Sequence, residues 1–365
     1  MEYLVPDNLF AYFQERSARG GLNVLESAEA WNVPNWRLGD PGTKILVWNT
    51  GHWGDGLFTT ALVRALKKRN PSLAIDIVAD RVSHHIWHRN KDIEGFRLSP
   101  LLIKVLGEYD GLIMLDEAGG GYDSIFQAAG ILDYEDSELI PNLPLFDSDE
   151  QFWARAMFPE VDGKRTTDVG YIVLGLHTSS KTRNLPPQTW RDLVVKLYEA
   201  NPNLPIYGLS SDAVGAGIQS YIAEAGIPTY KGVHAQLNIR SIACLIRLAR
   251  VVISPDTLFV HLAAAVGTPC AALMSTFAPL TRLRGYPLCV SIFRHDACRE
   301  LCEWHAPEFT MDRLGVISST ECYTPQTQFC KRMDAITPDE IMQAAGVAMM
   351  RKFNNQFKGW SDLPA

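Results

Sequence analysis

The stretch LVWNTGHWGDGLFTTALVRALKKRNPSLAIDIVAD, residues 46–80, decides the fold. It starts inside a short apolar run (44–49), passes through glycines around an aspartate, and then shows apolar residues at helical spacing up to a proline. A second apolar run follows at 74–80. Such runs are typical of strands covered on both faces, so the stretch predicts a βαβ unit, a right-handed crossover and a parallel sheet.

Strands and helices alternate along the rest of the chain. DGLIMLD (110–116) predicts a third strand, and a second series begins near residue 170 after a charged, turn-rich segment. Its predicted strands are 171–177, 204–210, 251–256 and 269–275, and its predicted helices are 186–201, 216–226, 241–250 and 257–267. This alternation predicts an α/β protein with two doubly wound Rossmann-like domains that face each other across a cleft, with ligands at the carboxyl ends of the strands.

We expect four segments along the chain. An irregular arm containing a short amphipathic helix comes first, the two Rossmann-like domains follow, and a tail closes the chain. Their predicted bounds are 1–43, 44–165, 166–350 and 351–365.

Composition limits the classes of function. The chain has 365 residues, enough for two domains, and its 47% hydrophobic and 21% charged residues are typical of a globular protein. A formal net charge of -7 argues against nonspecific nucleic-acid binding, although a local basic groove stays open as a hypothesis. We see no signal peptide and no membrane-spanning run, so we expect a cytoplasmic protein without a transmembrane segment.

The first motif is NTGHWGDG (49–56), where the first strand passes into a helix. Its glycines, among them Gly51 and Gly54, lie in a different order from the dinucleotide fingerprint but still allow close approach of the backbone, with Thr50, to a ligand. Asp55 has two interpretations. It is a helix N-cap, or it is a catalytic base that the helix dipole keeps ionised.

The second motif is HTSSKTRNLPPQTW (177–190), again between a strand and a helix. Lys181 and Arg183 lie among hydroxyl side chains, a combination that binds a diphosphate without a metal. The alternative is a solvated loop ahead of a helix that begins with prolines.

The third motif is VVISPDTLFVHLAAAVGTP (251–269). Asp256 ends an apolar strand, Thr257 follows, and the helix after them offers its N-terminus to phosphate oxygens. His261 is either a catalytic or binding residue of this site or a buried core histidine.

Seven cysteines are present, and four of them come late in the chain. Cys298, Cys302, Cys322 and Cys330 are zinc candidates, although their spacing is looser than that of typical zinc sites. Reduced thiols in a long loop are the alternative, and we expect no cofactor.

Four motifs in this order resemble glycosyltransferase family 9, the ADP-heptose:lipopolysaccharide heptosyltransferases. They are T-G-x-x-G-D after the first strand, K/R-x-x-P-x-x-x-W, D-T-x-x-x-H-L-A-A-A-x-G-T-P, and late cysteines followed by ITPDEI. The resemblance covers about residues 44–345. It implies a GT-B fold and metal-independent transfer with inversion at the anomeric carbon, in which the C-terminal domain holds the nucleotide sugar and the N-terminal domain the acceptor.

The resemblance also implies roles for single residues. Asp55 corresponds to the family's general base on the acceptor hydroxyl. Arg183 corresponds to a position, usually lysine, that contacts the leaving diphosphate, and Asp212 corresponds to an acidic residue that binds the ribose. The family's segment that surrounds the sugar and phosphates is represented in this sequence by Asp256, Thr257 and His261.

The sequence also departs from the family. Leu258 stands where glycine is usual, MSTFAPLT (274–281) replaces a phenylalanine-glycine-proline-threonine run, and Leu185 replaces tryptophan. These changes fall where the donor sugar is selected.

We therefore expect a glycosyltransferase that takes a nucleotide-diphosphate sugar and a hydroxyl acceptor. Two alternatives stay open, namely transfer to a nucleic-acid base or a protein, and a noncatalytic sugar-nucleotide-binding protein of the same fold.

Overall fold

The computed structural model describes most of the chain between Thr43 and Gln356. The described residues are 43–49, 53–79, 83–98, 108–115, 121–145, 160–161, 164–165, 170–178, 180–210, 212–234, 238–298 and 329–356. The predicted arm lies outside them except for Thr43, whereas the first residues of the predicted tail, 351–356, belong to the described helix α15 (Pro338–Gln356). Cα packing divides the chain into an N-terminal unit, Met1–Glu117 with Phe126–Leu132, and a C-terminal unit, Ala118–Ile125 with Asp133–Ala365.

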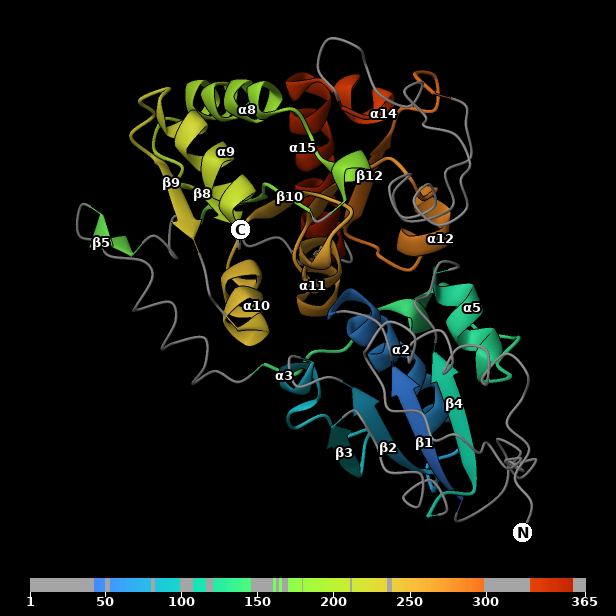
Figure 1. Cartoon of the computed structure of the whole chain (residues 1–365). Coiled ribbons are helices and arrows are strands. Elements are labelled where there is room, and N and C mark those ends of the chain that lie inside the picture. Colours follow the sequence, from blue (N-terminus) through green and yellow to red (C-terminus); the bar gives the residue numbers. More distant parts are fainter. Residues whose placement is uncertain are drawn as a thin grey trace. The chain divides into compact units, whose positions relative to one another are not determined.

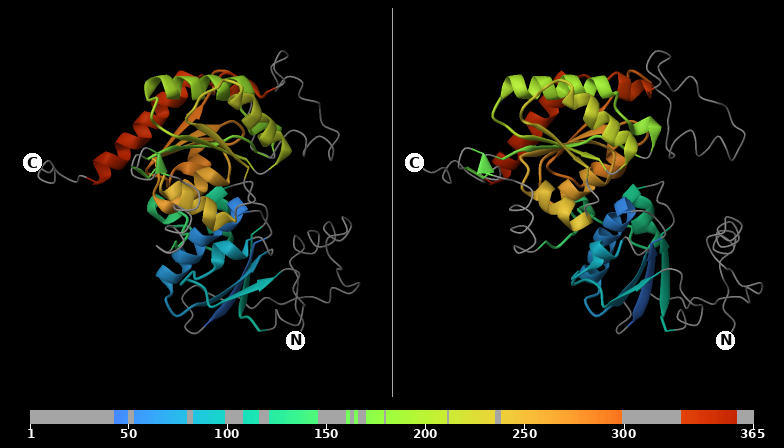
Figure 2. Two further views of the ribbon diagram at one scale, coloured as in Figure 1. Left: turned by 90° about the vertical axis from the view of Figure 1, so that its left-hand side faces the viewer. Right: turned by 60° about the vertical axis from the view of Figure 1, so that its left-hand side comes forward.

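The N-terminal unit contains a parallel four-stranded sheet of order β3-β2-β1-β4. Helices α2 and α3 pack together against one face of this sheet (Figure 2). The elements are β1 (Lys44–Asn49), α2 (Trp53–Arg69), β2 (Ala74–Ala79), α3 (His84–Trp87), β3 (Gly95–Leu98) and β4 (Gly111–Leu115). The predicted βαβ unit and the third predicted strand are confirmed.

The C-terminal unit contains a parallel six-stranded sheet of order β12-β11-β10-β7-β8-β9. Its central strands are buried along their length because Val, Ile, Leu and Ala fill both faces. The strands are β7 (Ile172–Gly175), β8 (Ile206–Ser210), β9 (Tyr230–His234), β10 (Val251–Pro255), β11 (Cys270–Met274) and β12 (Cys289–Phe293).

Helices cover both faces of this sheet (Figure 1). Four helices lie on one face, namely α8 (Pro187–Ala200), α9 (Ala213–Ala223), α14 (Lys331–Asp334) and α15 (Pro338–Gln356). Two lie on the other, α10 (Ile239–Arg247) and α11 (Leu258–Val266). Helix α11 ends at Gly267, whose φ of 70° is the left-handed conformation that favours glycine.

Shorter elements connect these layers. They are α5 (Gly121–Ala128), α12 (Pro279–Leu283), the 3-10 helices η1 (Asp136–Leu139) and η2 (Lys181–Arg183), and the strand pair β5 (Glu160–Val161) and β6 (Lys164–Arg165). The division between the two units falls inside α5, after Ile125.

Strands β3, β9 and β12 were not among the predicted strands. All three lie at sheet edges, where the described residues provide a partner strand on one side. Their sequences GFRL, YKGVH and CVSIF mix polar and apolar residues, and β3 and β12 are only half-buried. A search for long apolar runs therefore passes over them.

The strand order sets where a ligand binds. In the C-terminal unit the chain moves outward from β7 to β9 and then returns to place β10 on the other side of β7. The N-terminal unit repeats the pattern, with β4 placed beside β1. In doubly wound sheets the crevice at such a reversal, at the carboxyl ends of the strands, is the usual binding site.

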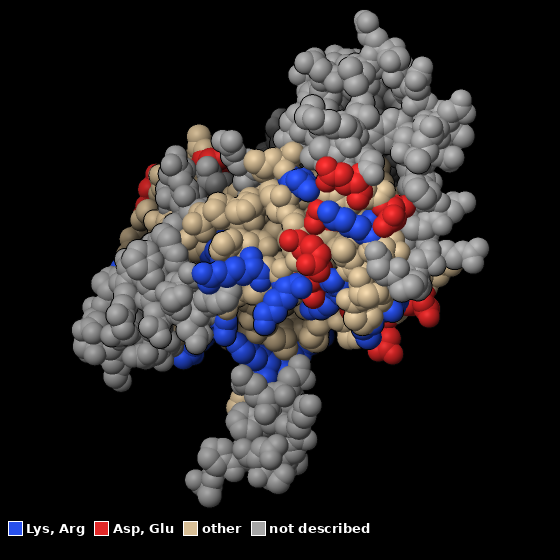
Figure 3. Space-filling model, turned by 90° about the horizontal axis from the view of Figure 1, so that it is seen from below, with Lys and Arg blue, Asp and Glu red and all other residues tan. Residues whose placement is uncertain are grey.

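No helix among the described residues is long and apolar enough to cross a membrane. On the face seen in Figure 3, Lys and Arg side chains lie among Asp and Glu side chains. The described part of that face therefore carries charges of both signs.

Candidate functional site

The candidate site of the C-terminal unit lies where the strand order reverses. The loop that follows β7 carries η2, and the loop that follows β10 carries Asp256 and the start of α11. Because β7 and β10 are adjacent parallel strands, both loops leave the sheet at the same edge. The structure thus brings the second and third sequence motifs together.

An asparagine fixes the shape of the loop after β7. The side chain of Asn184 accepts a hydrogen bond from the backbone N–H of Thr178 (2.8 Å) and donates one to the carbonyl of Thr178 (3.0 Å). The Thr178 hydroxyl accepts from the N–H of Ser180 (3.0 Å), and the carbonyl of Ser180 accepts from the N–H of Arg183 (3.1 Å). This loop is therefore not simply solvated, because buried hydrogen bonds hold it.

Arg183 reaches across to the loop after β10. Its Nη1 donates to the backbone carbonyl of Asp256 at 2.6 Å and lies 3.7 Å from the carboxylate Oδ2 of the same residue. The Arg183 side chain is 14% exposed, whereas that of Asp256 is 1% exposed. Asp256 therefore contacts the Arg183 guanidinium on its buried side, through the backbone carbonyl and the carboxylate. Arg183 is the residue of this pair that reaches solvent.

Thr257 begins α11 as its N-cap. Its side chain accepts from the N–H of Phe259 (3.2 Å) and lies 2.9 Å from the hydroxyl of Ser254. Gly175, at the end of β7, has no side chain because a Cβ there would come within 2.5 Å of both Phe259 and Ser254. Close packing of β7 on the first turn of α11 thus sets the position of this helix N-terminus, which attracts anions.

His261 lies behind Asp256 and is buried, with 2% exposure. Its Nε2 is 3.7 Å from Oδ1 of Asp256, and its Nδ1 is 2.9 Å from the hydroxyl of Tyr286. Burial lowers the pKa of His261 to about 4, with Arg282 and Arg183 acting in the same direction and Asp256 opposing them. His261 is therefore neutral near pH 7 and does not reach a ligand directly.

Asp212 lies one strand further along the same edge, after β8. It is the N-cap of α9, accepting from the N–H of Gly215 at 2.7 Å, and its Oδ2 is 2.7 Å from Nδ1 of His177. Partial burial acts to raise the pKa of Asp212, but the Gly215 N–H and the His177 ring outweigh it, and the pKa lies below its ordinary value. Its carboxylate is half-exposed and charged, which suits the hydroxyls of a ribose.

The first motif belongs to the N-terminal unit. Helix α2 begins at Trp53, so Asp55 lies in its first turn and the N-cap interpretation of Asp55 is wrong. Asp55 and Gly54 are both half-buried, and the Asp55 carbonyl accepts from the hydroxyl of Thr59 at 2.8 Å. Thr50 and Gly51 lie outside the described residues.

The predicted donor residue Lys181 is described only in part. Its backbone belongs to η2, but its side chain is not among the described ones.

The late cysteines are also described only in part. Cys298 and Cys330 are described, and Arg332 donates from Nε to the carbonyl of Cys298 at 2.9 Å. Burial raises the pKa of the Cys330 thiol, and Cys298 adds to the shift. The described residues contain no metal-binding cluster of three or more ligands, and Cys302 and Cys322 lie outside them.

Three side chains of this site were not predicted from the sequence. Asn184 shapes the first loop, Tyr286 contacts His261, and Arg282 is 4% exposed with its guanidinium 3.8 Å from the centre of the Phe277 ring. Asn184 follows Arg183 within the second motif and was within reach of a motif search. The other two lie in TFAPLTRLRGYP (276–287), where nothing but the departure from the family pattern marks them.

The charges next to the start of α11 favour an anion. Arg183 and Arg282 carry two positive charges there, Asp256 carries one negative charge, and His261 is neutral, while the charged Asp212 lies one strand away, after β8. The N-terminus of α11 adds a partial positive charge. The arrangement can therefore hold a group with negative oxygens, with Arg183 as its exposed donor.

Comparison with known proteins gives the site a family context. Residues 122–298, a little less than half of the chain, match the family model of glycosyltransferase family 9 (heptosyltransferase). No curated protein matches the sequence.

Solved structures extend the likeness over most of the chain. A glycosyltransferase of family 9 from Veillonella parvula DSM 2008 aligns with a TM-score of 0.62 and 13% identity, over 85% of this chain and 98% of that one. The E. coli ADP-heptose lps heptosyltransferase II aligns with a TM-score of 0.59 and 14% identity, over 85% and 99%. The iron-containing dodecameric glycosyltransferase TibC from enterotoxigenic E. coli H10407 aligns with a TM-score of 0.57 and 13% identity, over 87% and 81%.

At these identities the alignments show the fold, which is the predicted GT-B fold. The family model confirms the predicted resemblance to glycosyltransferase family 9 and, with it, the predicted enzyme class, a glycosyltransferase.

Proposed function

We propose that the protein is an inverting, metal-independent glycosyltransferase that moves a sugar from a nucleotide-diphosphate sugar, ADP-heptose-like, to an acceptor hydroxyl. The observation that carries the proposal is the contact of Arg183 with Asp256 at the reversal of strand order in the C-terminal unit. A cation held there by a buried carboxylate supports a phosphate site that uses side-chain and helix charges in place of a metal.

The donor would bind to the C-terminal unit. Arg183 and Lys181, with the N-terminus of α11, would hold the diphosphate, and Thr257 would line the same edge. Asp212 would accept hydrogen bonds from the ribose, and Val214, which is 60% exposed in the first turn of α9, offers apolar surface to a nucleobase. Asp256 and His261, both buried, would support this site from behind without touching the donor.

The acceptor would bind to the N-terminal unit, with Asp55 as general base beside Thr50, Gly51 and Gly54. Asp55 would take the proton of the acceptor hydroxyl as its oxygen attacks the anomeric carbon. The bond from that carbon to the diphosphate oxygen would break on the opposite face, and Arg183 would stabilise the negative charge that the leaving diphosphate gains. Attack and departure on opposite faces invert the anomeric configuration.

The nature of the donor rests on relatives. TibC is described in complex with ADP-D-beta-D-heptose, in a structure that aligns with a TM-score of 0.54 and 13% identity. Leu258 and Phe277 stand where this chain departs from the family pattern, so the sugar is the part of the donor most open to change. Transfer to a nucleic-acid base or a protein, and donor binding without transfer, are the alternatives that the experiment must separate.

The test combines a donor screen with one substitution. Thermal-shift measurements against ADP-, GDP-, UDP- and CDP-sugars identify the donor, since a ligand that binds only the native state raises the apparent stability. Mass spectrometry then follows transfer to candidate acceptors. Asp55→Asn should lower kcat roughly 100- to 10,000-fold and leave the donor Kd nearly unchanged. Full activity of Asp55→Asn, or donor binding with no transfer by the wild type to any acceptor class, would contradict the proposal.

The late cysteines stay a separate hypothesis. TibC is described as iron-containing, and this chain places Cys298 near Cys330. Metal analysis of the purified protein beside Cys330→Ser would decide between a metal site and reduced thiols, because loss of a ligand lowers the metal content.

A further inference from the structure

Two tyrosines form a buried chain of hydroxyl groups behind His261. The Tyr286 hydroxyl lies 2.9 Å from Nδ1 of His261 and 2.5 Å from the hydroxyl of Tyr122. The three side chains are 1–3% exposed, and all belong to the C-terminal unit. The rings meet edge to face, with centroids 5.8 Å apart for His261 and Tyr286 and 6.1 Å apart for Tyr286 and Tyr122. Their geometry is therefore fixed by packing as well as by hydrogen bonds.

The direction of the chain follows from the groups at its ends. Neutral imidazole carries one N–H, and the carboxylate of Asp256, which faces Nε2, can only accept. The proton of His261 therefore belongs on Nε2, and Nδ1 accepts from the Tyr286 hydroxyl. The Tyr286 oxygen in turn accepts from Tyr122. Burial raises the pKa of Tyr286 well above its ordinary value, with Tyr122 contributing, so its hydroxyl keeps its proton.

We propose that Tyr286, supported by Tyr122, is a positioning residue of the donor site. The two hydroxyls fix the tautomer and ring orientation of His261, so that an N–H faces one oxygen of the Asp256 carboxylate while Arg183 faces the other. The carboxylate is thereby held in the orientation that keeps the guanidinium at the carboxyl edge of the sheet. This inference rests on the proposed function, because it uses the proposal that Arg183 contacts the diphosphate of the donor.

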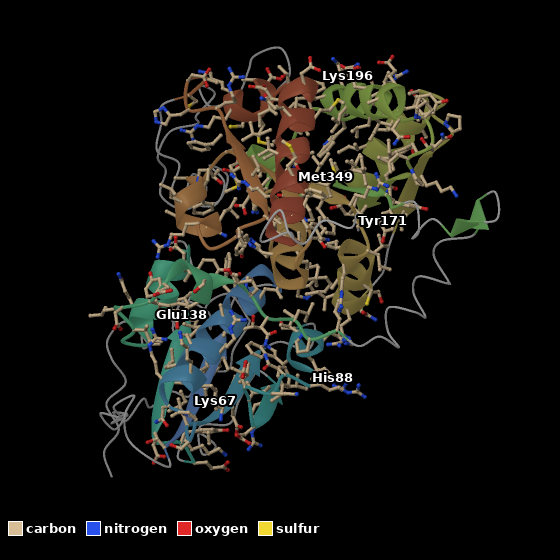
Figure 4. All side chains as sticks on the ribbon, turned by 180° about the vertical axis from the view of Figure 1, so that it is seen from behind. Lys67, His88, Glu138, Tyr171, Lys196 and Met349 are labelled. Carbon is tan, nitrogen blue, oxygen red and sulfur yellow. The ribbon has the colours of Figure 1, made fainter. Side chains whose placement is uncertain are left out.

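Tyr171 provides a matched control. It is fully buried in the same unit, directly before β7, and its hydroxyl donates to the backbone carbonyl of Leu245 at 2.5 Å (Figure 4). Removing its hydroxyl breaks a buried hydrogen bond of similar length, but one that ends on α10 and not on His261. A purely structural role of Tyr286 predicts the same consequences for both tyrosines.

The experiment compares Tyr286→Phe, Tyr122→Phe and Tyr171→Phe in the full chain. Calorimetric titration with nucleoside diphosphates should show Tyr286→Phe weakening the Kd roughly threefold to tenfold, the range expected for one lost hydrogen bond. Tyr122→Phe should weaken it less, and Tyr171→Phe should leave it within about twofold while still lowering the stability. Equal affinities of Tyr286→Phe and Tyr171→Phe would overturn the proposal.

A second measurement is independent of donor binding. Nitrogen-15 spectra of the imidazole groups at pH 7 report which ring nitrogen of His261 is protonated. The wild type should show the Nε2–H tautomer, and Tyr286→Phe should show a mixture. An Nδ1–H tautomer in the wild type, or no change in Tyr286→Phe, would contradict the positioning role. If the wild type binds no nucleotide, the proposed function fails while this spectrum still decides the role of Tyr286.

Discussion

Each unit places an aspartate after one of the two strands that flank its reversal of strand order, although the two strands are not equivalent in the topology. In each, one strand next to the reversal of strand order leads into a helix, β1 into α2 and β10 into α11. Asp55 follows β1, lies in the first turn of α2 and is half-buried. Asp256 directly follows β10, precedes the N-cap of α11 and is 1% exposed. The carboxylate beside the reversal is therefore accessible in the N-terminal unit and buried in the C-terminal unit.

This difference separates two chemical tasks. A general base must reach a substrate proton, so a half-buried carboxylate at a helix N-terminus suits that task. A carboxylate that organises a cation gains from burial, because the attraction between opposite charges is stronger away from water. This difference agrees with the roles that we propose, proton transfer for Asp55 and support of Arg183 for Asp256.

The largest effect should come from removing each carboxylate. Asp256→Ala leaves Arg183 beside a buried cavity and should cost about 3–5 kcal/mol of unfolding free energy, as expected for breaking a buried ion pair. Asp55→Ala removes a charge near a helix N-terminus and should cost about 1 kcal/mol or less. Urea unfolding followed by circular dichroism measures both. Equal costs would break the comparison.

The pH dependence of stability should sharpen the comparison, because it tests whether the surroundings of Asp256 are buried. His261 has a folded-state pKa of about 4, below its ordinary value of 6.5, so the unfolded chain binds a proton that the folded chain does not. This contribution is present above pH 6.5 and is lost as the pH falls from 6.5 towards 4, up to about 3 kcal/mol. His261→Gln should flatten the curve in that interval. An unchanged slope in the variant would show that His261 is not buried neutral beside Asp256.

Substitutions of two glycines by alanine should have the smallest effects on stability. A Cβ on Gly175 would lie 2.5 Å from Ser254 and Phe259, which hold the start of α11, so Gly175→Ala should cost about 1–3 kcal/mol. Gly56, inside α2, is its counterpart. There the Cβ would meet the end of the flexible Ile86 side chain at 2.8 Å, and the gain in helix propensity offsets part of the strain. Gly56→Ala should therefore change the stability by less than about 1 kcal/mol. Thermal unfolding that ranks the two variants the other way would show that the start of α11 is not tightly packed.

The sequence predicted the central strands of both sheets because their residues are apolar on both faces. It did not predict β3, β9 and β12, because these three edge strands carry mixed side chains, whereas the edge strand β4 is apolar and was predicted. The site follows the same division. The segments that follow strands mark Arg183, Asp256, Thr257 and His261 as candidates. Asp55 was predicted for the same reason, and its catalytic role stays a prediction.

The tyrosines that support His261 could not be predicted from the spacing of residues in the sequence. Tyr286 is 25 residues from its partner His261, and Tyr122 is 164 residues from Tyr286. Neither belongs to a motif, and the sequence around each, GGGYDS (119–124) and RLRGYP (282–287), gives no sign of a buried site. The fold brings these groups together, because β7 pairs with β10 and the first part of α5, which carries Tyr122, belongs to the C-terminal unit.

One calorimetric experiment tests the division of tasks most directly. ADP, with GDP, UDP and CDP beside it, is titrated into the wild type, Arg183→Ala and Asp55→Asn. We expect at least one diphosphate to bind the wild type and Asp55→Asn with the same Kd. Arg183→Ala should bind it roughly tenfold to a hundredfold more weakly, the loss expected for a hydrogen bond to a charged group. Undiminished binding by Arg183→Ala, or an equal loss in Asp55→Asn, would contradict the account.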